Sequence, residues 1–412
     1  MSDPNLTEVP AHPVGPTPRI RPVLPQQTCR PDKCEMRIHI GVFFDGTGNN
    51  RFEHEPLKKQ SNVARLFRAF PDDPLEGYFR VYVPGIGTEF PEIGEIEPAT
   101  FGSAFGAGGD GRINFGLLQV INAVHSSVSP SRRLYVADGT VRALCRNSAR
   151  RRIHTRSGSQ LSPLAESVDA AALRAVGMDS KGGLLLDNGG RSAHRLAFFK
   201  KASAAIAEKV SQSDKPKLTE VFIDVFGFSR GAAQARTFCN WLCEIFDGSN
   251  LCGVPATIRF LGLFDSVASV GLPTSSGVGT DGHASWADAP LLRIPAAVKN
   301  CVHFVAMHEN RGSFPVELVR VAGTLPANCH EYMFPGMHSD VGGGYKPNEQ
   351  GRGPTGRDEE KLSLLPLEAM YIAATTALVP LDKARAAFWA SMADRQKPRR
   401  VRAWLLEFLA WR

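Results

Sequence analysis

A serine flanked by two glycines is the first feature of this sequence that could do chemistry. Residues 227–231 read Gly-Phe-Ser-Arg-Gly, and they follow an apolar run at 221–226 with the length of a buried strand. They precede residues 232–246, where apolar side chains recur at helical spacing. A strand, Gly-x-Ser-x-Gly and a helix in this order are typical of a nucleophile elbow, which exposes its serine at the positive end of a helix. We therefore predict that Ser229 is a nucleophile, with Gly227 and Gly231 closing the turn.

A serine hydroxyl is a poor nucleophile until a base takes its proton and a carboxylate orients that base. Asp265 ends a second strand-like run at 258–264, which places it at the same sheet edge as the elbow. The alternative is that Asp265 only caps or turns the chain. His338 follows a Pro-Gly turn and precedes three glycines, so we expect it on a loop and predict that it is the base.

Two other histidines compete with His338 for the role of base. His303 and His308 lie in or just after another apolar run, Cys-Val-His-Phe-Val-Ala-Met-His. We interpret them as strand or strand-end residues whose polar atoms are satisfied locally. The order Ser229, Asp265, His338 is the order of an α/β-hydrolase triad.

The oxyanion of a tetrahedral intermediate is usually held by two backbone N–H groups. We expect one from Arg230 and the other from the loop that follows an early strand at residues 38–44. That loop contains Asp45, Gly46 and Thr47, and its glycines let amides turn inward. A haloacid-dehalogenase phosphatase would also carry Asp-Gly-Thr here, but its nucleophilic aspartate would fall at Phe43, so we reject that interpretation.

Five sequence blocks in the same order resemble a known family. They are GVFFDGTGNN, YVPGIGTE, GFSRGAAQARTF, FLGLFDSVASVG and FPGMHSDVGGGY, and they span residues 41–345. They are similar to the phospholipase effectors of bacterial type VI secretion, the type VI lipase effector family. The resemblance implies an α/β-hydrolase-like fold, with a mainly parallel sheet between helices. It also implies a serine hydrolase with Ser229, Asp265 and His338 as its triad and membrane glycerophospholipid as its substrate.

The same resemblance implies how such a chain is used. A type VI lipase effector is an antibacterial toxin made in the bacterial cytoplasm and injected into the envelope of a target cell. It would travel with a secretion-spike carrier and be neutralised by a cognate immunity protein. The sequence begins without a basic and apolar leader, as expected for that route. An esterase or lipase on small or neutral esters without a toxin role, and a non-catalytic phosphate-binding adaptor, remain the alternative functions.

Composition divides the 412 residues into three parts. Residues 1–31 contain eight prolines and are expected to form a flexible arm. Residues 37–345 are expected to form the catalytic domain, with an insertion at about 130–190. Residues 346–412 are expected to form a helical tail, which either packs on the domain or lies at a membrane interface.

The inserted segment is basic, with eight arginines and one acidic residue between positions 132 and 156. Lipid headgroups and a merely solvated surface are both consistent with this cluster. Nucleic acid is disfavoured, because no nucleic-acid-binding motif accompanies the arginines.

The eight cysteines and the acidic loop residues give little sign of a metal or cofactor. Most of the cysteines are scattered in apolar surroundings and are expected to be free buried thiols. Cys29 and Cys34 bracket four residues and could form a disulfide, which the sequence alone leaves open. Calcium at Asp45 and Asp340 is conceivable, but we expect these carboxylates to bind neighbouring amides instead. We therefore expect no cofactor.

Overall fold

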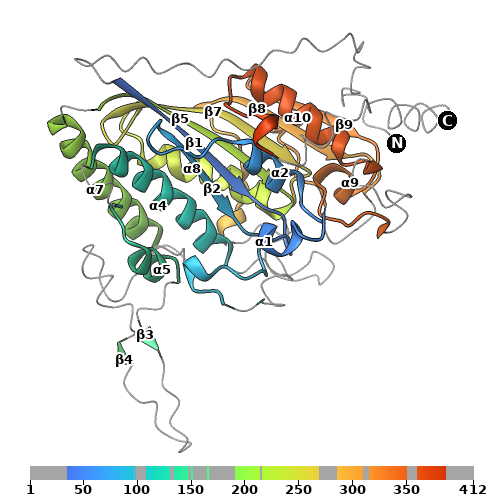
Figure 1. Cartoon of the computed structure of the whole chain (residues 1–412), viewed down its shortest axis with the longest axis horizontal. Helices are drawn as coiled ribbons and strands as arrows, with labels where there is room; N and C mark the ends of the chain where they lie inside the picture. The colour runs from blue at the N-terminus through green and yellow to red at the C-terminus, as the bar shows by residue number, and fades with distance from the viewer. Residues whose placement is uncertain are drawn as a thin grey trace, which may run out of the picture.

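A seven-stranded sheet is the centre of the computed structural model. The structure describes residues 35–96, 98, 108–129, 134–146, 150–151, 165–166, 191–213, 216–268, 285–309, 315–349 and 360–386. The strand order is β2-β1-β5-β7-β8-β9, and every pair along this path is parallel. The bounds are Tyr78–Val83, Glu35–Phe44, Lys217–Phe228, Val254–Phe264, Val298–Ala306 and Cys329–Phe334. A short strand β6, Asn250–Leu251, pairs antiparallel with β7. All six parallel strands therefore end at one edge of the sheet (Figure 1).

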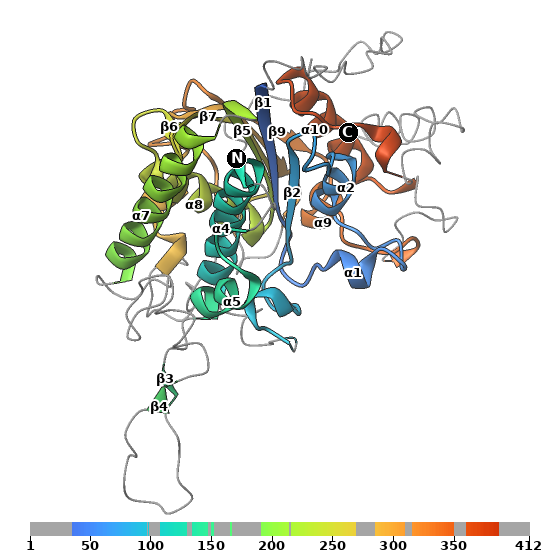
Figure 2. The ribbon, with the colours of Figure 1, turned by 60° about the vertical axis from the view of Figure 1, so that its left-hand side comes forward.

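Helices cover both faces of this sheet (Figure 2). One face carries α4 (Gly109–Val128), α7 (Arg191–Gln212) and α8 (Arg230–Ile245), with α5 (Asp138–Arg146) packed against α4. The other face carries α2 (Asn62–Ala69) and α10 (Leu364–Thr376), together with α9 (His338–Gly342). Two separate clusters of buried apolar side chains fill the two sides. The α/β-hydrolase-like architecture predicted from the sequence is confirmed.

The strands of the main sheet have continuous apolar sequences because both of their faces are buried. Between Ile38 and Phe44 every side chain is buried, as expected for a parallel strand covered on both faces. One buried ion pair interrupts the apolar interior of the sheet. Arg259 of β7 binds Asp224 of β5 through two hydrogen bonds of 2.9 and 2.5 Å. His39 of β1 packs beside this ion pair, and burial lowers the pKa of His39 to about 3. The pair therefore fixes the register of three adjacent strands.

The expected insertion and tail are partly described. Within the former, α5 buries Val141 and Leu144 against the core. Strands β3 (Arg150–Arg151) and β4 (Ala165–Glu166) pair with each other and not with the main sheet. At the other end of the chain, α10 packs Leu367 and Met370 into the core, where Met370 lies against Gly262 of β7. The Pro-rich arm, the Cys29–Cys34 pair and residues 387–412 lie outside the described residues.

Six cysteines within the described residues are free, and all but Cys243 are buried, as predicted. No helix in this part of the chain combines the length and apolar character needed to cross a bilayer.

Candidate active site

Ser229 occupies a strained turn between β5 and α8. Its φ and ψ are 59° and −130°, a conformation that residues with a side chain rarely adopt. The turn is closed by hydrogen bonds from Ser229 N to Phe264 O (3.0 Å) and from Val267 N to Ser229 O (3.2 Å). These bonds hold the serine against the end of β7. Such strain usually persists at functional sites, so the turn has the properties predicted for a nucleophile elbow.

Both glycines of the elbow stand where a side chain would not fit. A Cβ at Gly227 would lie 2.5 Å from the carbonyl oxygen of Gly231. A Cβ at Gly231 would lie 2.3 Å from the carbonyl oxygen of Asp45, at the end of β1. The second glycine therefore lets the start of α8 approach the loop after β1.

Asp265 and His338 form a hydrogen-bonded pair at the same edge of the sheet. Nδ1 of His338 lies 2.6 Å from Oδ2 of Asp265, and the other carboxylate oxygen accepts a bond of 2.8 Å from Ala306 N. Both carboxylate oxygens are therefore occupied, which fixes the side chain of Asp265. Since the carboxylate accepts at Nδ1, the nitrogen left to face a serine hydroxyl is Nε2.

His338 begins α9, so the prediction that it lies on a loop is wrong. The carboxylate of Asp340 accepts a hydrogen bond of 2.9 Å from Met337 N and caps the start of this helix. A short sequence rich in glycine can thus form one helical turn because its own aspartate satisfies the first amide. The position of His338 is more rigid than a loop would make it.

Phe228, the residue before Ser229, supports the histidine. Its ring lies 4.7 Å from the His338 ring and is only 2% exposed. The ring is also seated against Gly46 and Gly342, where an added Cβ would come within 2.5 and 1.9 Å of it. Phe228 therefore joins the elbow, the loop after β1 and α9 into one packed unit.

The loop after β1 lies beside the elbow, and its amides are mostly engaged. Gly46 N donates to Asp45 Oδ1 at 2.8 Å, Gly48 N donates to Ile86 O at 3.0 Å, and Asn49 N donates to Gly46 O at 2.9 Å. Thr47 N, by contrast, makes no hydrogen bond among the described residues. The guanidinium of Arg230 binds the Thr47 hydroxyl through a 2.7 Å bond from Nε, and burial lowers the pKa of Arg230 to about 10.

A buried network anchors the same loop to β2 and α1 (Arg51–His54). The hydroxyl of Tyr82 donates to Asp45 Oδ2 at 2.5 Å and accepts from Arg51 N at 2.8 Å. Burial raises the pKa of Asp45 to about 6, although hydrogen bonds from Ser61, Tyr82 and Gly46 act in the opposite direction. Asp45 therefore supports the loop through hydrogen bonds to Gly46 and Tyr82.

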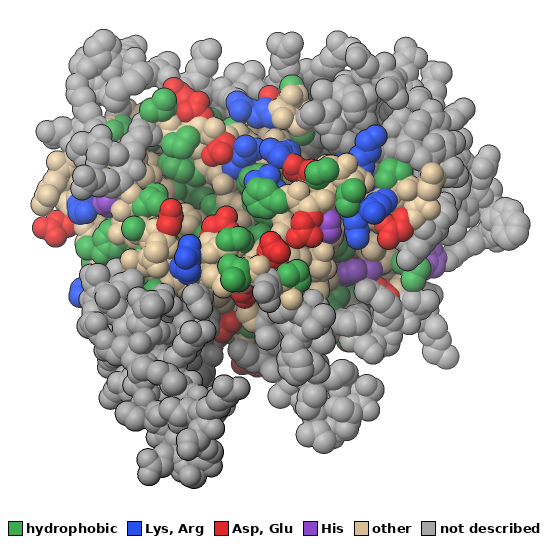
Figure 3. Space-filling model, turned by 60° about the horizontal axis from the view of Figure 1, so that its bottom comes forward, with side chains coloured by type: hydrophobic (Ala, Val, Ile, Leu, Met, Phe, Trp, Pro, Cys, Tyr) green, Lys and Arg blue, Asp and Glu red, His purple; other side chains and the backbone are tan. Residues whose placement is uncertain are grey.

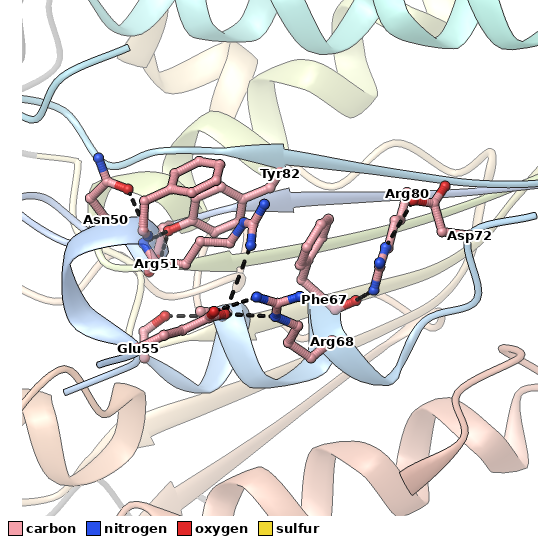
Figure 4. Close-up of polar contacts among 12 residues, drawn as sticks. Asn50, Arg51, Glu55, Phe67, Arg68, Asp72, Arg80 and Tyr82 are labelled. Atoms are coloured by element: carbon pink, nitrogen blue, oxygen red, sulfur yellow. Dashed lines mark hydrogen bonds and ion pairs between the residues drawn. The ribbon is translucent and has the colours of Figure 1, made fainter. Parts of the chain in front are cut away.

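Arg51 continues this network toward the surface. Its guanidinium lies over the Phe67 and Tyr82 rings, at 4.8 and 5.3 Å from their centroids, and Glu55 lies between Arg51 and Arg68 (Figure 4). Arg80 binds Asp72 on the far side of Phe67 (Figure 4). On the face turned toward the viewer in Figure 3, hydrophobic, basic and acidic side chains of the described residues intermix, so their surface there carries no uniform charge.

The chain beyond Asp265 is tied to α8. Arg236 is buried and donates hydrogen bonds to the carbonyl oxygens of Leu292, Glu317 and Leu318. Thr237 binds the carbonyl oxygen of Trp286, whose side chain is also buried. Residues 285–293 are therefore packed against α8.

The two competing histidines, His303 and His308, each form hydrogen bonds with neighbouring residues. His303 lies in β8, binds Glu331 at 3.0 Å and accepts from Ser266 N at 3.1 Å. His308 follows β8 and accepts from Gly336 N at 3.0 Å. Both histidines are thus satisfied locally, as predicted, and so are Asp45 and Asp340, which bind neighbouring amides.

In the described part of the chain, Asp265, Glu309 and His338 are the group that comes within the spacing of metal ligands, and it includes neither Asp45 nor Asp340. Glu309 was missed in the sequence, because it follows β8 without any motif.

The chain is similar to known proteins over part of its length. Residues 246–373 match the family model for the T6SS phospholipase effector Tle1-like catalytic domain. A crystal structure of an uncharacterized protein from Pseudomonas aeruginosa is 31% identical, with a TM-score of 0.63 over 86% of this chain and 47% of that one. A Tle1 effector bound to the VgrG spike of the type 6 secretion system is 20% identical, with a TM-score of 0.35 over 76% of this chain and 52% of that one. No curated protein matches.

A parallel sheet that carries a serine elbow and an Asp-His pair at one edge defines an α/β-hydrolase-like protein. Residues 246–373 are similar to the catalytic domain of Tle1-like type VI secretion phospholipase effectors, and this segment contains Asp265 and His338. The chain spans about half the length of the solved structures that it matches.

Proposed function

We propose that this chain is a serine-dependent phospholipase that cleaves the acyl ester bonds of membrane glycerophospholipids. The observation that carries the proposal is the 2.6 Å contact of His338 with Asp265, at the sheet edge where Ser229 occupies a strained elbow. Two of the seven non-glycine residues with positive φ in the described chain are Ser229 and Asp265. Strain at both positions favours a catalytic role over a capping role.

In this mechanism the Ser229 hydroxyl attacks the acyl carbonyl carbon while His338 Nε2 takes its proton. His338 then donates that proton to the leaving glycerol oxygen, and a water repeats the sequence to release the fatty acid. Asp265 holds the Nδ1–H tautomer and stabilises the imidazolium that forms in each half. The buried site keeps these charges in a low dielectric, where their interactions are strong.

We assign the oxyanion contacts to the amides of Arg230 and Thr47. Arg230 opens α8, where the first N–H groups point along the positive end of the helix. Thr47 is favoured over Gly46 because the Gly46 amide already binds the Asp45 carboxylate. The Arg230–Thr47 hydrogen bond would hold the two donors in one orientation.

As a type VI effector, the chain would leave the producing cell on a spike carrier and act on the envelope of a target cell. The match of residues 246–373 to the catalytic domain of Tle1-like type VI secretion effectors supports this route. A cognate immunity protein in the producing cell would follow from a toxin role. Calcium or another cofactor is not required by the proposed chemistry.

The test is to incubate the purified chain with phospholipid vesicles and, separately, with a soluble short-chain ester, and to identify the products. Ser229→Ala and His338→Ala should each lower hydrolysis of both by several orders of magnitude, and Asp265→Asn by up to about 10⁴-fold. Ser211→Ala on α7, where the serine only binds the Glu208 carbonyl, is the matched control and should keep full activity.

Full turnover by a folded Ser229→Ala variant would refute the proposal. Cleavage of the soluble ester without release of fatty acid from vesicles would favour an esterase without a toxin role. Vesicle or phosphate binding with no hydrolysis by the wild type would favour a non-catalytic adaptor.

A further inference from the structure

The segment that leaves β8 runs between the two members of the Asp265–His338 pair. On one side, Ala306 N donates to the Asp265 carboxylate at 2.8 Å. On the other, Met307 N donates to Phe334 O at 2.9 Å and His308 N donates to Gly336 O at 3.0 Å. The chain from β8 is therefore bound to both strands that carry the pair, and its course is fixed by backbone hydrogen bonds.

His308 adds a side-chain contact to this arrangement. Its Nδ1 accepts a hydrogen bond of 3.0 Å from Gly336 N, two residues before His338. The next residue along the chain is Glu309, which is partly exposed. Oxygen atoms of Glu309 and Asp265 and a ring nitrogen of His338 all lie within 4.8 Å of one another. The edge thus brings two carboxylates to one imidazole, from the ends of two adjacent strands.

We propose that Glu309 is a positioning residue for His338, a second carboxylate that stabilises its protonated form during proton transfer. The proposal rests on the triad mechanism proposed above. When the Ser229 proton moves to Nε2, the ring gains a positive charge, and a carboxylate within 4.8 Å favours that charge. Asp265 has both oxygens engaged and fixes the ring, and Glu309 adds a second negative charge from the end of the neighbouring strand β8.

The proximity of Glu309 to His338 also predicts what happens when Asp265 is replaced by an uncharged residue. Glu309 is then the carboxylate that remains beside the imidazole, so its contribution should rise. A residue that merely supports the fold would contribute the same amount in both backgrounds, because independent effects add. The interaction between the two substitutions therefore separates a role in proton transfer from a structural one.

The experiment measures kcat/KM on a soluble short-chain ester from pH 5 to pH 9 in a chelator-containing buffer. Glu309→Gln should lower kcat/KM by about tenfold and shift the acidic limb of the profile by about one pH unit to lower pH. The shift has this sign because removing a negative charge makes protonation of the neighbouring base harder. In the Asp265→Asn background the same substitution should cost about a hundredfold, and Glu309→Asp should retain most of the rate of its parent protein in both backgrounds.

The matched control is Glu208→Gln. It removes an exposed carboxylate from α7, on the sheet face that also carries α4 and α8. It should leave both rate and profile unchanged. An unshifted acidic limb with equal losses in both backgrounds would overturn the role of Glu309, even if Ser229→Ala is inactive and the triad stands. A Glu309→Gln effect that appears only with added divalent cation would also overturn it, since the carboxylate would then be a metal ligand.

Discussion

A single methyl group at Gly46 should disturb the catalytic edge without touching any reacting group. A Cβ at this position would lie 2.5 Å from Cδ1 of Phe228 and 2.8 Å from the side-chain nitrogen of Asn49. An ordinary contact begins at 3.4 Å, so either the loop or the ring must move by about 0.9 Å. The ring has little freedom, because it is seated against Gly342 and lies 4.7 Å from the His338 ring.

The expected cost can be worked out from this displacement. A shift of about 1 Å in a catalytic group can cost about 10²-fold in rate, and loss of one oxyanion donor costs about 10²- to 10³-fold. Gly46→Ala should therefore lower kcat by about 10²-fold, or about 2.7 kcal/mol of transition-state stabilisation. KM should change little, because the donor acts on the oxyanion and not on the bound ester. Overpacking should also lower the free energy of unfolding by about 1–3 kcal/mol.

The same loop offers its own control. Gly48 has φ of 71° and open space around it, with nothing within 4 Å of an added Cβ. Gly48→Ala should therefore cost about 1–2 kcal/mol of backbone strain but leave kcat within about threefold of the wild type. Steady-state kinetics on a soluble ester, with circular dichroism to verify folding, compares the two. Full turnover in folded Gly46→Ala, or equal losses in both variants, would refute the reasoning.

Two further predictions concern stability. Burial holds the pKa of Asp45 at about 6 against an ordinary 3.8, so its contribution to stability is present below pH 4 and is lost as the pH rises through 6. Urea unfolding at pH 4 and pH 7 measures this loss, which is up to about 3 kcal/mol of the free energy of unfolding. Asp45→Asn should abolish the loss. The same pH dependence in the variant and the wild type would contradict a buried carboxyl at this position. Asp224→Asn should lower the free energy of unfolding by about 3 kcal/mol, because the Arg259 charge loses its buried partner. The kcat of the Asp224→Asn variant should stay at the wild-type value, because five residues of strand, about 16 Å, separate position 224 from Ser229. A matching fall in kcat would indicate coupling along β5.

The elbow and the strands could be predicted from local sequence, because both depend on residues close together in the chain. A buried parallel strand requires a continuous apolar run, and the turn at Ser229 requires small neighbours within two residues. The positions of Asp265 and His338 were predictable for a related reason: parallel strands end at one edge, so residues that follow successive strands meet there. His303 and His308 have local hydrogen-bond partners, as their places in and after an apolar run predicted.

The local hydrogen bonds at His338 and Gly46, and the contact between neighbouring strands at Glu309, could not be predicted in the same way. The helical start at His338 depends on Asp340 reaching back to Met337, and the role of the Gly46 amide depends on which acceptor lies nearest. Glu309 carries no motif, and it comes near His338 only because β8 lies between β7 and β9. Strand order is a property of the whole sheet, so no local pattern records it.

What the sequence predicted by itself was therefore the kind of chemistry: a serine in an elbow, followed by an acid and a histidine in hydrolase order. The tertiary structure decided which atoms face one another. Phe228 illustrates the difference, because it is an ordinary apolar residue in the sequence and the common wall of Gly46, Gly342 and His338 in the fold. A side chain's type is set by the gene, but its neighbours are set by packing, which joins residues more than a hundred positions apart.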